Sequence, residues 1–555
     1  MATHKEVIGI ILSGGTTTEA TCQLLESAEK GNVKEGMLVL IESEERKLLA
    51  RIAQIIPYNA FYTEGDAWSE ARRKGYPIPE EVARKYEICK LDLLIEIPRL
   101  EIRSPPEPGD FVLKIDPKQH LKEIFGVSPG DPRYIWIGTL SGYERSSLPV
   151  PLYVENIPMH IAIFGVTGSG KSFTTGALIE RLTEIPINNN VVSYPMIIID
   201  AHGDYTDYAN YIANGNKLGS AKWVKRYVFP RALMERINLR VMKNVKPIGI
   251  NLDLINCREL AEIIILYYKG TLEGAELQIT GLERLFEYML EDKGYSGIQS
   301  LFINYFDELK KELEKIAEEM GIAHQTKVAI FRALDSFKVI EEKHKLLSTD
   351  SELKKFDFID NITCEGGIAI FDFSADGAPG VDLKTKQFVM TYLATLLFDH
   401  FTQYKTKKED RYLLLIIEEA QNFCPDKSYP ISFSLAHTKL SAIATQGRKF
   451  GLSLCLISQR PSFVDRIILS MCNTFFIHRV SPEDVNFVRS ICGGLPLSLA
   501  SRLTTMGRGD VIITGQMLSV PFPLLVHILE GDRKIKHTIG KTNVCERLAE
   551  LRGFS

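Results

Sequence analysis

Short apolar segments separated by turn residues run through the first 145 residues. They are alternating or fully apolar, and they lie at residues 7–12, 37–42, 48–56, 91–97 and 134–139. Strands of this length and spacing are typical of a small β-barrel or a sandwich. The prolines around Pro105 interrupt the pattern, and those at Pro149 and Pro151 predict the exit to a second domain.

The pattern changes near residue 155, where buried-type apolar runs begin to alternate with helical segments. Such an alternation predicts an α/β fold with a mostly parallel sheet wound on both faces. We therefore expect an N-terminal β-barrel at 1–145, a core in two parts at 146–254 and 361–530, a helical insertion at 255–360 and a C-terminal tail at 531–555.

The predicted insertion is highly charged and carries one apolar stripe with spacings of three and four. The stripe consists of Phe302, Phe306, Leu309, Leu313, Ile316 and Met320. This period indicates a helix that packs on its own domain. The alternative is a surface that faces a partner.

Composition narrows the class of protein. The 66 Lys+Arg and 70 Asp+Glu give a net charge of −4, so any contact with nucleic acid must be local. Nine cysteines without a C-x-x-C pair indicate reduced thiols rather than a disulfide framework or a zinc site. No apolar run reaches the roughly 18 residues of a membrane span, and the N-terminus carries no readable secretory signal. We expect a cytoplasmic protein without membrane association.

The strongest chemical signal is GVTGSGKS at 165–172, a complete G-x-x-x-x-G-K-[ST] phosphate-binding loop, or P-loop. A predicted strand precedes it and a predicted helix at 171–183 follows it, which is the order that makes the motif functional. Backbone N–H groups would face the phosphates, Lys171 the β- and γ-phosphate oxygens, and Ser172 a magnesium ion. ATP and Mg²⁺ are the predicted cofactors. The residues expected to contact the nucleotide are Gly165, Thr167, Gly168, Ser169, Gly170, Lys171, Ser172 and Phe173.

Two acids end the apolar run at 413–417. Charges at the end of a buried strand need a partner, and hydrolysis needs carboxylates beside the phosphates. We predict that Glu418 belongs to the magnesium shell and that Glu419 positions the attacking water. The alternative is a solvated strand end.

Two further strands end in polar residues that we expect at the same edge of the sheet. Asp200 follows the run at 196–199 and either joins the metal and water network or caps a turn. Gln459 follows the run at 452–457, where an amide could sense the γ-phosphate. Both are therefore candidate catalytic residues.

Arg448 precedes the strand at 452–457, which predicts a position at the opposite edge of the sheet from the carboxylates. An arginine there could reach the nucleotide of a neighbouring subunit as a finger in trans, a role worth about 10³ to 10⁵ in turnover. The alternative is a surface cation. Arg479 is the second candidate for the finger.

In order along the chain, these motifs resemble those of the HerA branch of the HerA/FtsK superfamily of ring-forming DNA translocases. The match runs through GVTGSGKS at 165–172, IIIDAHGDY at 197–205, LLLIIEEAQNF at 413–423, GRKFG at 447–451, SQRP at 458–461 and GRGDVIITG at 507–515. The resemblance covers most of the chain, and the stretch at 255–360 least. It implies a RecA-like P-loop NTPase core with the small β-barrel of the family at the N-terminus.

The resemblance also implies a function. It suggests a homohexamer around a central channel for double-stranded DNA, with ATP bound between subunits and a partner on the ring. That partner is usually a NurA-type nuclease acting in DNA end resection, or another effector in bacterial relatives. By motif, Lys171, Glu419 and Arg448 would be the phosphate lysine, the catalytic glutamate and the trans finger. The chain departs from the family pattern at Gln446, where Glu is common, and at Gln421, where His is common.

A second functional class stays open on sequence alone. A nucleotide-gated ring could assemble and regulate an effector, for example in antiphage defence, without moving along DNA. The basic run Lys405, Lys407 and Lys408 is the nearest candidate for DNA contact, with a solvated loop as the alternative. Stimulation of ATP hydrolysis by duplex DNA would separate a translocase from such a platform.

Overall fold

The computed structural model describes residues 6–28, 33–43, 46–59, 62, 69–76, 85–98, 100–128, 130–431, 433–535, 548 and 552. The chain divides into two compact units. The first contains Met1–Val154, Gly168–Gly170 and Phe475–Asp532, and the second contains Glu155–Thr167, Lys171–Thr474 and Arg533–Ser555. Most of the predicted tail at 531–555, including Cys545, lies outside the described residues. The other eight cysteines are free thiols.

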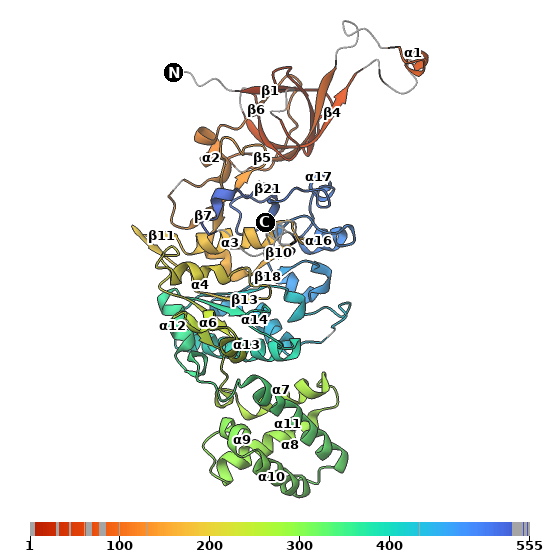
Figure 1. Ribbon diagram of the computed structural model, residues 1–555. Coiled ribbons are helices and arrows are strands. Elements are labelled where there is room, and N and C mark those ends of the chain that lie inside the picture. The colour runs from red at the N-terminus through yellow and green to blue at the C-terminus, as the bar shows by residue number, and fades with distance from the viewer. Residues whose placement is uncertain are drawn as a thin grey trace. The chain divides into compact units, whose positions relative to one another are not determined.

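The N-terminal strands close into an antiparallel barrel in the order β1-β2-β5-β4-β3-β6 (Figure 1). The strands are β1 Val7–Ile11, β2 Glu19–Leu24, β3 Leu38–Glu42, β4 Lys47–Tyr58, β5 Tyr86–Ile97 and β6 Phe111–Lys114. The barrel expected from the sequence is thus confirmed. The apolar pattern failed to predict β2 and β6, because β2 alternates with polar residues and β6 has only four residues.

A buried ion pair ties the barrel to the C-terminal part of the same unit. The Arg51 guanidinium donates to Asp92 at 2.9 Å and to the carbonyl of Pro523 at 3.1 Å, and the Ser498 hydroxyl donates to Asp92 at 2.6 Å. The remaining elements of the unit are α1 Ser69–Arg73, α2 Pro117–Phe125, β7 Tyr134–Ile137, β8 Thr139–Leu140, β9 Val150–Tyr153, α16 Val485–Ile491, α17 Leu497–Ala500, β20 Asp510–Gly515 and β21 Leu524–His527. Strands β20, β21 and β8 are antiparallel neighbours.

The second unit is built on parallel strands in the order β15-β14-β16-β13-β17-β18-β10. Their bounds are β10 Ile161–Phe164, β13 Met196–Asp200, β14 Val224–Val228, β15 Val245–Pro247, β16 Ile368–Asp372, β17 Leu413–Ile417 and β18 Leu452–Ser458. Every residue of β10, β13, β16, β17 and β18 is buried, as expected for strands covered on both faces. The predicted α/β fold is confirmed.

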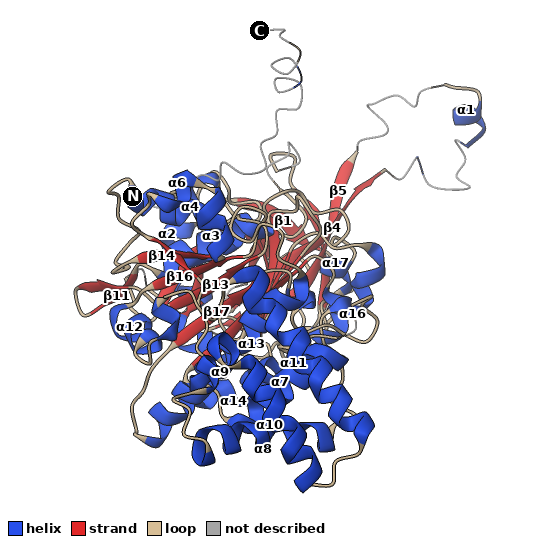
Figure 2. Cartoon of the chain, turned by 60° about the horizontal axis from the view of Figure 1, so that its bottom comes forward, coloured by secondary structure: helices blue, strands red, loops and turns tan. Residues whose placement is uncertain are grey.

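Helices cover both faces of this sheet, with α3 and α4 on one side and α13 and α14 on the other (Figure 2). The bounds are α3 Lys171–Leu182, α4 Thr206–Ala213, α5 Pro230–Glu235, α6 Ile237–Arg240, α12 Phe358–Glu365, α13 Leu383–Thr406, α14 His437–Gln446 and α15 Arg466–Ser470. A short hairpin, β11 Ile185–Ile187 with β12 Asn190–Val192, follows α3. Among the described helices, none combines the length and apolar character that a membrane span requires.

Five helices gather into a separate lobe of the second unit (Figure 1). They are α7 Cys257–Lys269, α8 Glu276–Glu287, α9 Ile298–Asn304, α10 Phe306–Glu319 and α11 His324–His344. The predicted stripe is divided between α9 and α10, and five of its six residues are buried. Met320 follows α10 and is 43% exposed. The stripe therefore packs within the lobe, as the first of the two sequence interpretations expects.

Candidate nucleotide-binding site

The P-loop lies between β10 and α3, in the predicted order of strand, loop and helix. Gly168 and Gly170 adopt φ values of 75° and 110°, which only glycine reaches without strain. Lys171 begins α3, and its ammonium donates to the carbonyl of Val166 at 3.2 Å. Burial lowers the pKa of Lys171, while Glu419 and Glu418 favour its charged form. The loop is therefore a cationic cradle that faces two carboxylates.

The remaining predicted nucleotide contacts surround this cradle. The N–H of Gly165 donates to the carbonyl of Ser458 at 3.3 Å, which joins the loop to β18. Ser172 is half-buried in the first turn of α3, and the Phe173 ring lies 5.8 Å from the Arg533 guanidinium. The Ser169 hydroxyl is buried and has no hydrogen-bond partner within the described part of the chain. The contact of these residues with a nucleotide stays a prediction.

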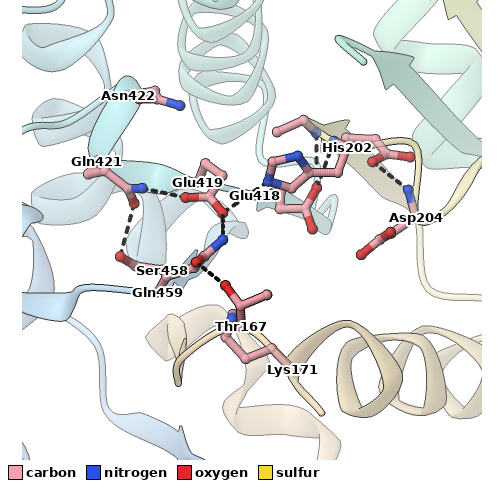
Figure 3. Close-up of polar contacts among 12 residues, drawn as sticks. Thr167, Lys171, His202, Asp204, Glu418, Glu419, Gln421, Asn422, Ser458 and Gln459 are labelled. Carbon is pink, nitrogen blue, oxygen red and sulfur yellow. Dashed lines mark hydrogen bonds and ion pairs between the residues drawn. The ribbon is translucent and has the colours of Figure 1, made fainter. Parts of the chain in front are cut away.

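Glu419 directly follows Glu418 at the carboxyl end of β17, and three side chains hold its carboxylate (Figure 3). His202 and Gln459 contact Oε1 at 3.1 and 2.6 Å. Gln421 donates to Oε2. Glu419 itself has φ and ψ of 50°, a left-handed conformation that is costly for a residue with a side chain. The structure thus holds this carboxylate in a strained and well-defined position.

Gln459 connects Glu419 to the P-loop. Its Nε2 donates to Glu419, and its Oε1 accepts a hydrogen bond from the Thr167 hydroxyl at 2.6 Å. Thr167 and Gln459 are 292 residues apart in the sequence. A ligand that contacts Thr167 would therefore affect the position of Glu419 through the Gln459 amide. This arrangement supports the predicted sensor role of Gln459.

The neighbouring amide of Gln421 has only one orientation that satisfies its partners. Its Oε1 accepts from the Ser458 hydroxyl at 2.9 Å, so its Nε2 must donate to Glu419. The Ser458 hydroxyl oxygen in turn accepts from the N–H of Arg460 at 3.1 Å. Gln421, which stands where the family commonly has His, thus fixes Glu419 through a group that does not titrate.

These contacts control the ionisation of the site. Burial alone would raise the pKa of Glu419, but hydrogen bonds from His202, Gln421 and Gln459 outweigh it and hold the pKa below its usual range. The hydrogen bond to Glu419 raises the pKa of His202. Glu419 is therefore ionised at neutral pH and can accept a hydrogen bond from water.

Glu418 provides the oxygen chemistry that Mg²⁺ prefers. It is 4% exposed, and its Oε2 accepts from the N–H groups of Ala201 and His202 at 3.0 and 3.2 Å. Burial raises the pKa of Glu418, and the negative charge of Asp200 raises it further. A cation here would stabilise the ionised form of Glu418. The described residues contain no cluster of three acidic, His or Cys side chains that could hold a metal alone. The donor set fits an ion shared among Glu418, Ser172 and the phosphates.

Asp200 caps the turn after β13. Its Oδ1 accepts from the N–H groups of Gly203 and Asp204 at 2.7 and 3.0 Å, and its Oδ2 from that of Tyr205 at 2.9 Å. The side chain is fully buried. These contacts describe the turn-capping alternative, and the cap positions His202 beside Glu419. A direct role of Asp200 in hydrolysis stays a prediction.

The two candidate finger arginines lie in different places. Arg448 is exposed in the turn Gly447–Phe450 after α14, directly before β18, and therefore at the edge opposite the carboxylates. Arg479 is half-buried and follows His478, which lies beside Gly170 of the P-loop of its own chain. Lys405, Lys407 and Lys408 are exposed at the end of α13, before β17. Among these residues, Arg448 has the position that suits a finger in trans.

His160 precedes β10 and is buried as a neutral imidazole. Its Nδ1 accepts from the N–H of Leu454 at 3.0 Å, so its Nε2 must donate to the carbonyl of Ala444 at 2.9 Å. Burial lowers the pKa of His160 to about 4, the bond to Ala444 opposes this shift, and the nearby Arg448 adds to it. His160 thus joins β10, β18 and α14 at the edge where Arg448 lies.

Stability should fall as the pH decreases from about 6.5 to 4, because the unfolded chain binds a proton at His160 that the folded chain excludes. The full effect is about 3 kcal/mol in the free energy of unfolding. Urea unfolding of the wild type and of His160→Asn at pH 7 and pH 5 measures the part lost between these two pH values, about 2 kcal/mol. Asn tolerates the left-handed φ of 60° at this position and does not titrate. We expect a smaller loss of stability between the two pH values in the variant, and equal losses would contradict the assignment.

Sequence reasoning missed the residues that position Glu419. His202 stands inside the IIIDAHGDY segment, so its motif was visible, but nothing local indicates that it meets Glu419 217 residues away. Gln421 differs from the family pattern, but the sequence does not indicate that it contacts Glu419. The link from Thr167 to Gln459 depends on the adjacency of β10 and β18, which the sequence alone does not contain.

Comparison with known proteins agrees with the motifs. The family model described as "Helicase HerA, central domain" matches residues 135–397. The chain is 26% identical over 546 residues to the DNA double-strand break repair helicase HerA of Sulfurisphaera tokodaii, covering 95% of this chain and 94% of the relative. It is 26% identical over 540 residues to HerA of Sulfolobus acidocaldarius, covering 94% of each.

Among solved structures, VirB4 of Thermoanaerobacter pseudethanolicus aligns over 73% of this chain and 99% of its own, with a TM-score of 0.46 and 14% identity. The matches to HerA helicases extend over nearly the whole chain, and the barrel, the parallel sheet and the P-loop are those that the resemblance implies. Residues 135–397 thus match the central domain of HerA helicases, and the chain is similar to these helicases over nearly its whole length.

Proposed function

We propose that this protein is an ATP-dependent DNA translocase and helicase that acts in double-strand break repair. It would hydrolyse ATP at the P-loop with Mg²⁺, and homohexameric rings would carry double-stranded DNA in a central pore. A NurA-type nuclease or another effector on the ring would cut the DNA. The relatives named as double-strand break repair helicases support this assignment.

One observation carries the hydrolysis part of the proposal. Glu419 is ionised, held by three side chains, and connected through Gln459 to Thr167 of the P-loop. A carboxylate so placed can orient a water for attack on the γ-phosphate. Because the same amide contacts both loop and carboxylate, nucleotide binding and water positioning are coupled. Such coupling is what a motor requires to convert hydrolysis into movement.

The test is the steady-state rate of ATP hydrolysis with and without linear duplex DNA. We expect DNA to stimulate the wild type, and the stimulation to fall steeply between low and moderate salt, because contacts to phosphates release counterions. Lys171→Ala should abolish hydrolysis under all conditions. Lys315→Ala, which removes an exposed lysine on α10, should behave like the wild type.

Two outcomes would contradict parts of the proposal. Hydrolysis that persists in Lys171→Ala would show that the P-loop is not the active site. Hydrolysis that needs Lys171 but ignores DNA would instead favour a nucleotide-gated platform that regulates an effector without translocation. In that case the rate should respond to the partner protein.

A further inference from the structure

The segment GRGD at 507–510 lies against the P-loop of its own chain. The N–H of Gly509 donates to the carbonyl of Ser169 at 3.2 Å. A Cβ at Gly170 would lie 3.2 Å from that same nitrogen and 3.4 Å from the Gly509 Cα. The two backbones thus lie so close together that a side chain at Gly170 would require a displacement. The turn and the tip of the P-loop, residues 168–170, belong to one compact unit.

The turn is fixed from several sides. Asp510 accepts from the N–H of Gly507 at 3.1 Å and contacts Nδ1 of His527 at 2.7 Å. The carbonyl of Asp510 accepts from Nδ1 of His478 at 2.9 Å. Gly509 has a φ of 87°, so the turn also depends on a conformation that favours glycine. The position of residue 508 relative to the P-loop tip is therefore well defined.

Arg508 occupies this position and has no role in the site described above. It is exposed, and within the described part of the chain it makes no hydrogen bond or ion pair. Packing within the unit does not use this exposed guanidinium. Packing alone therefore does not explain why a rigid turn holds it beside the P-loop. Guanidinium groups bind phosphate oxygens with two parallel hydrogen bonds.

We propose that Arg508 binds the α- and β-phosphates of the nucleotide held by the P-loop of its own subunit. The backbone N–H groups of residues 168–170 serve those same phosphates by motif, which makes them the nearest anions that the turn can reach. Arg508 would add a cation beside the tip of the loop, and so increase affinity for ADP and ATP alike. This inference rests on the proposed ATPase activity.

The test is the affinity of the full-length protein for Mg-ADP, measured by calorimetry without DNA. Loss of one charge-assisted phosphate contact should weaken binding about 10- to 100-fold in Arg508→Ala. Arg508→Lys should recover part of the loss, because it keeps the charge but not the paired hydrogen bonds. Arg145→Ala, an exposed arginine of the same unit outside the turn, should bind as the wild type does.

ADP is the informative ligand because it lacks the γ-phosphate. An arginine that acts only on the γ-phosphate of a neighbouring subunit would slow hydrolysis but leave the affinity for ADP unchanged. Wild-type affinity in Arg508→Ala would therefore overturn the proposal, while loss of binding in Lys171→Ala would show that the nucleotide site itself stands. If the wild type binds neither ADP nor ATP, both this inference and the proposed ATPase are wrong.

Thermal unfolding distinguishes a disturbed turn at 507–510 from the loss of the phosphate contact of Arg508. The Arg508 side chain has no described partner, so the thermal midpoint of Arg508→Ala should equal that of the wild type. Gly509→Ala should lower both the midpoint and the affinity, because it strains the turn. Weak ADP binding in Arg508→Ala with a lowered midpoint, as in Gly509→Ala, would assign the residue to packing and overturn the proposal.

Discussion

Glu419→Gln is expected to slow ATP hydrolysis by about 10²- to 10⁴-fold while leaving the affinity for ATP close to that of the wild type. In the proposed mechanism the carboxylate accepts a hydrogen bond from the attacking water, and an amide cannot take its proton. The phosphates would lie in the P-loop, so Glu419 would not bind them itself. Single-turnover hydrolysis measures the chemical step, and equilibrium binding of a non-hydrolysable analogue measures the affinity.

The surroundings of Glu419 make Asp the informative second variant. Three donors converge on the carboxylate, from His202, Gln421 and Gln459. Glu419→Gln faces one of them with a second donor, so it also disturbs the network. Glu419→Asp keeps the charge but withdraws it by one methylene, and it should retain more activity than the amide.

The matched control is Glu273→Gln on the helical lobe, whose exposed carboxylate lies outside the site. It should hydrolyse ATP at the wild-type rate. If Glu419→Gln retained wild-type turnover, Glu419 would be the solvated strand end that the sequence left open. If it lost affinity and turnover together, Glu419 would be needed for nucleotide binding rather than for hydrolysis.

Local features of the site could be predicted from the sequence. The P-loop is contiguous, its glycines need positive φ at Gly168 and Gly170, and its flanking strand and helix follow from apolar periodicity. The edge that carries Glu418, Asp200 and Gln459 could also be predicted, because parallel strands bring their carboxyl ends together. Each of these predictions needs only one apolar strand and the residue that follows it in the sequence.

Contacts between strands could not be predicted in the same way. The role of Gln459 depends on β18 lying directly between β10 and β17, which places the amide between Thr167 and Glu419. Apolar runs specify that strands are buried but not which strands are neighbours. The positive φ of Glu419 is likewise invisible in the sequence, since glutamate rarely adopts it.

Asp200 shows a different limit. An acid after a buried strand suits both a metal ligand and a turn cap, and residue type does not distinguish them. Its three backbone hydrogen bonds describe a cap. Asp372, in register with Asp200 on β16, pairs instead with the buried Arg226 at 2.9 Å. All four acids thus have hydrogen-bond partners, and Glu418 and Glu419 in addition favour the charged form of the P-loop lysine.

Arg448 lies too far from the P-loop of its own subunit to contact the nucleotide there. His160, at the amino end of β10, donates to the carbonyl of Ala444 in α14 and senses the charge of Arg448. The four residues of β10, about 13 Å of strand, separate this edge from the P-loop. An arginine side chain cannot cross that distance to its own nucleotide. Any nucleotide that Arg448 contacts must therefore belong to another subunit.

Arg448→Ala should reduce ATP turnover by about 10³- to 10⁵-fold, which corresponds to about 4 to 7 kcal/mol in the barrier. Lys449→Ala, which removes the adjacent exposed cation, should have little effect. The decisive measurement is co-assembly of Arg448→Ala with Lys171→Ala, two variants that are each inactive alone. If the finger acts in trans, an intact P-loop on one subunit meets an intact Arg448 on the next, and hydrolysis returns at about one site in four at equal mixing. Wild-type turnover in Arg448→Ala alone would assign Arg448 to the surface and leave Arg479 as the candidate, and mixed rings that stay inactive would show that Arg448 does not act in trans.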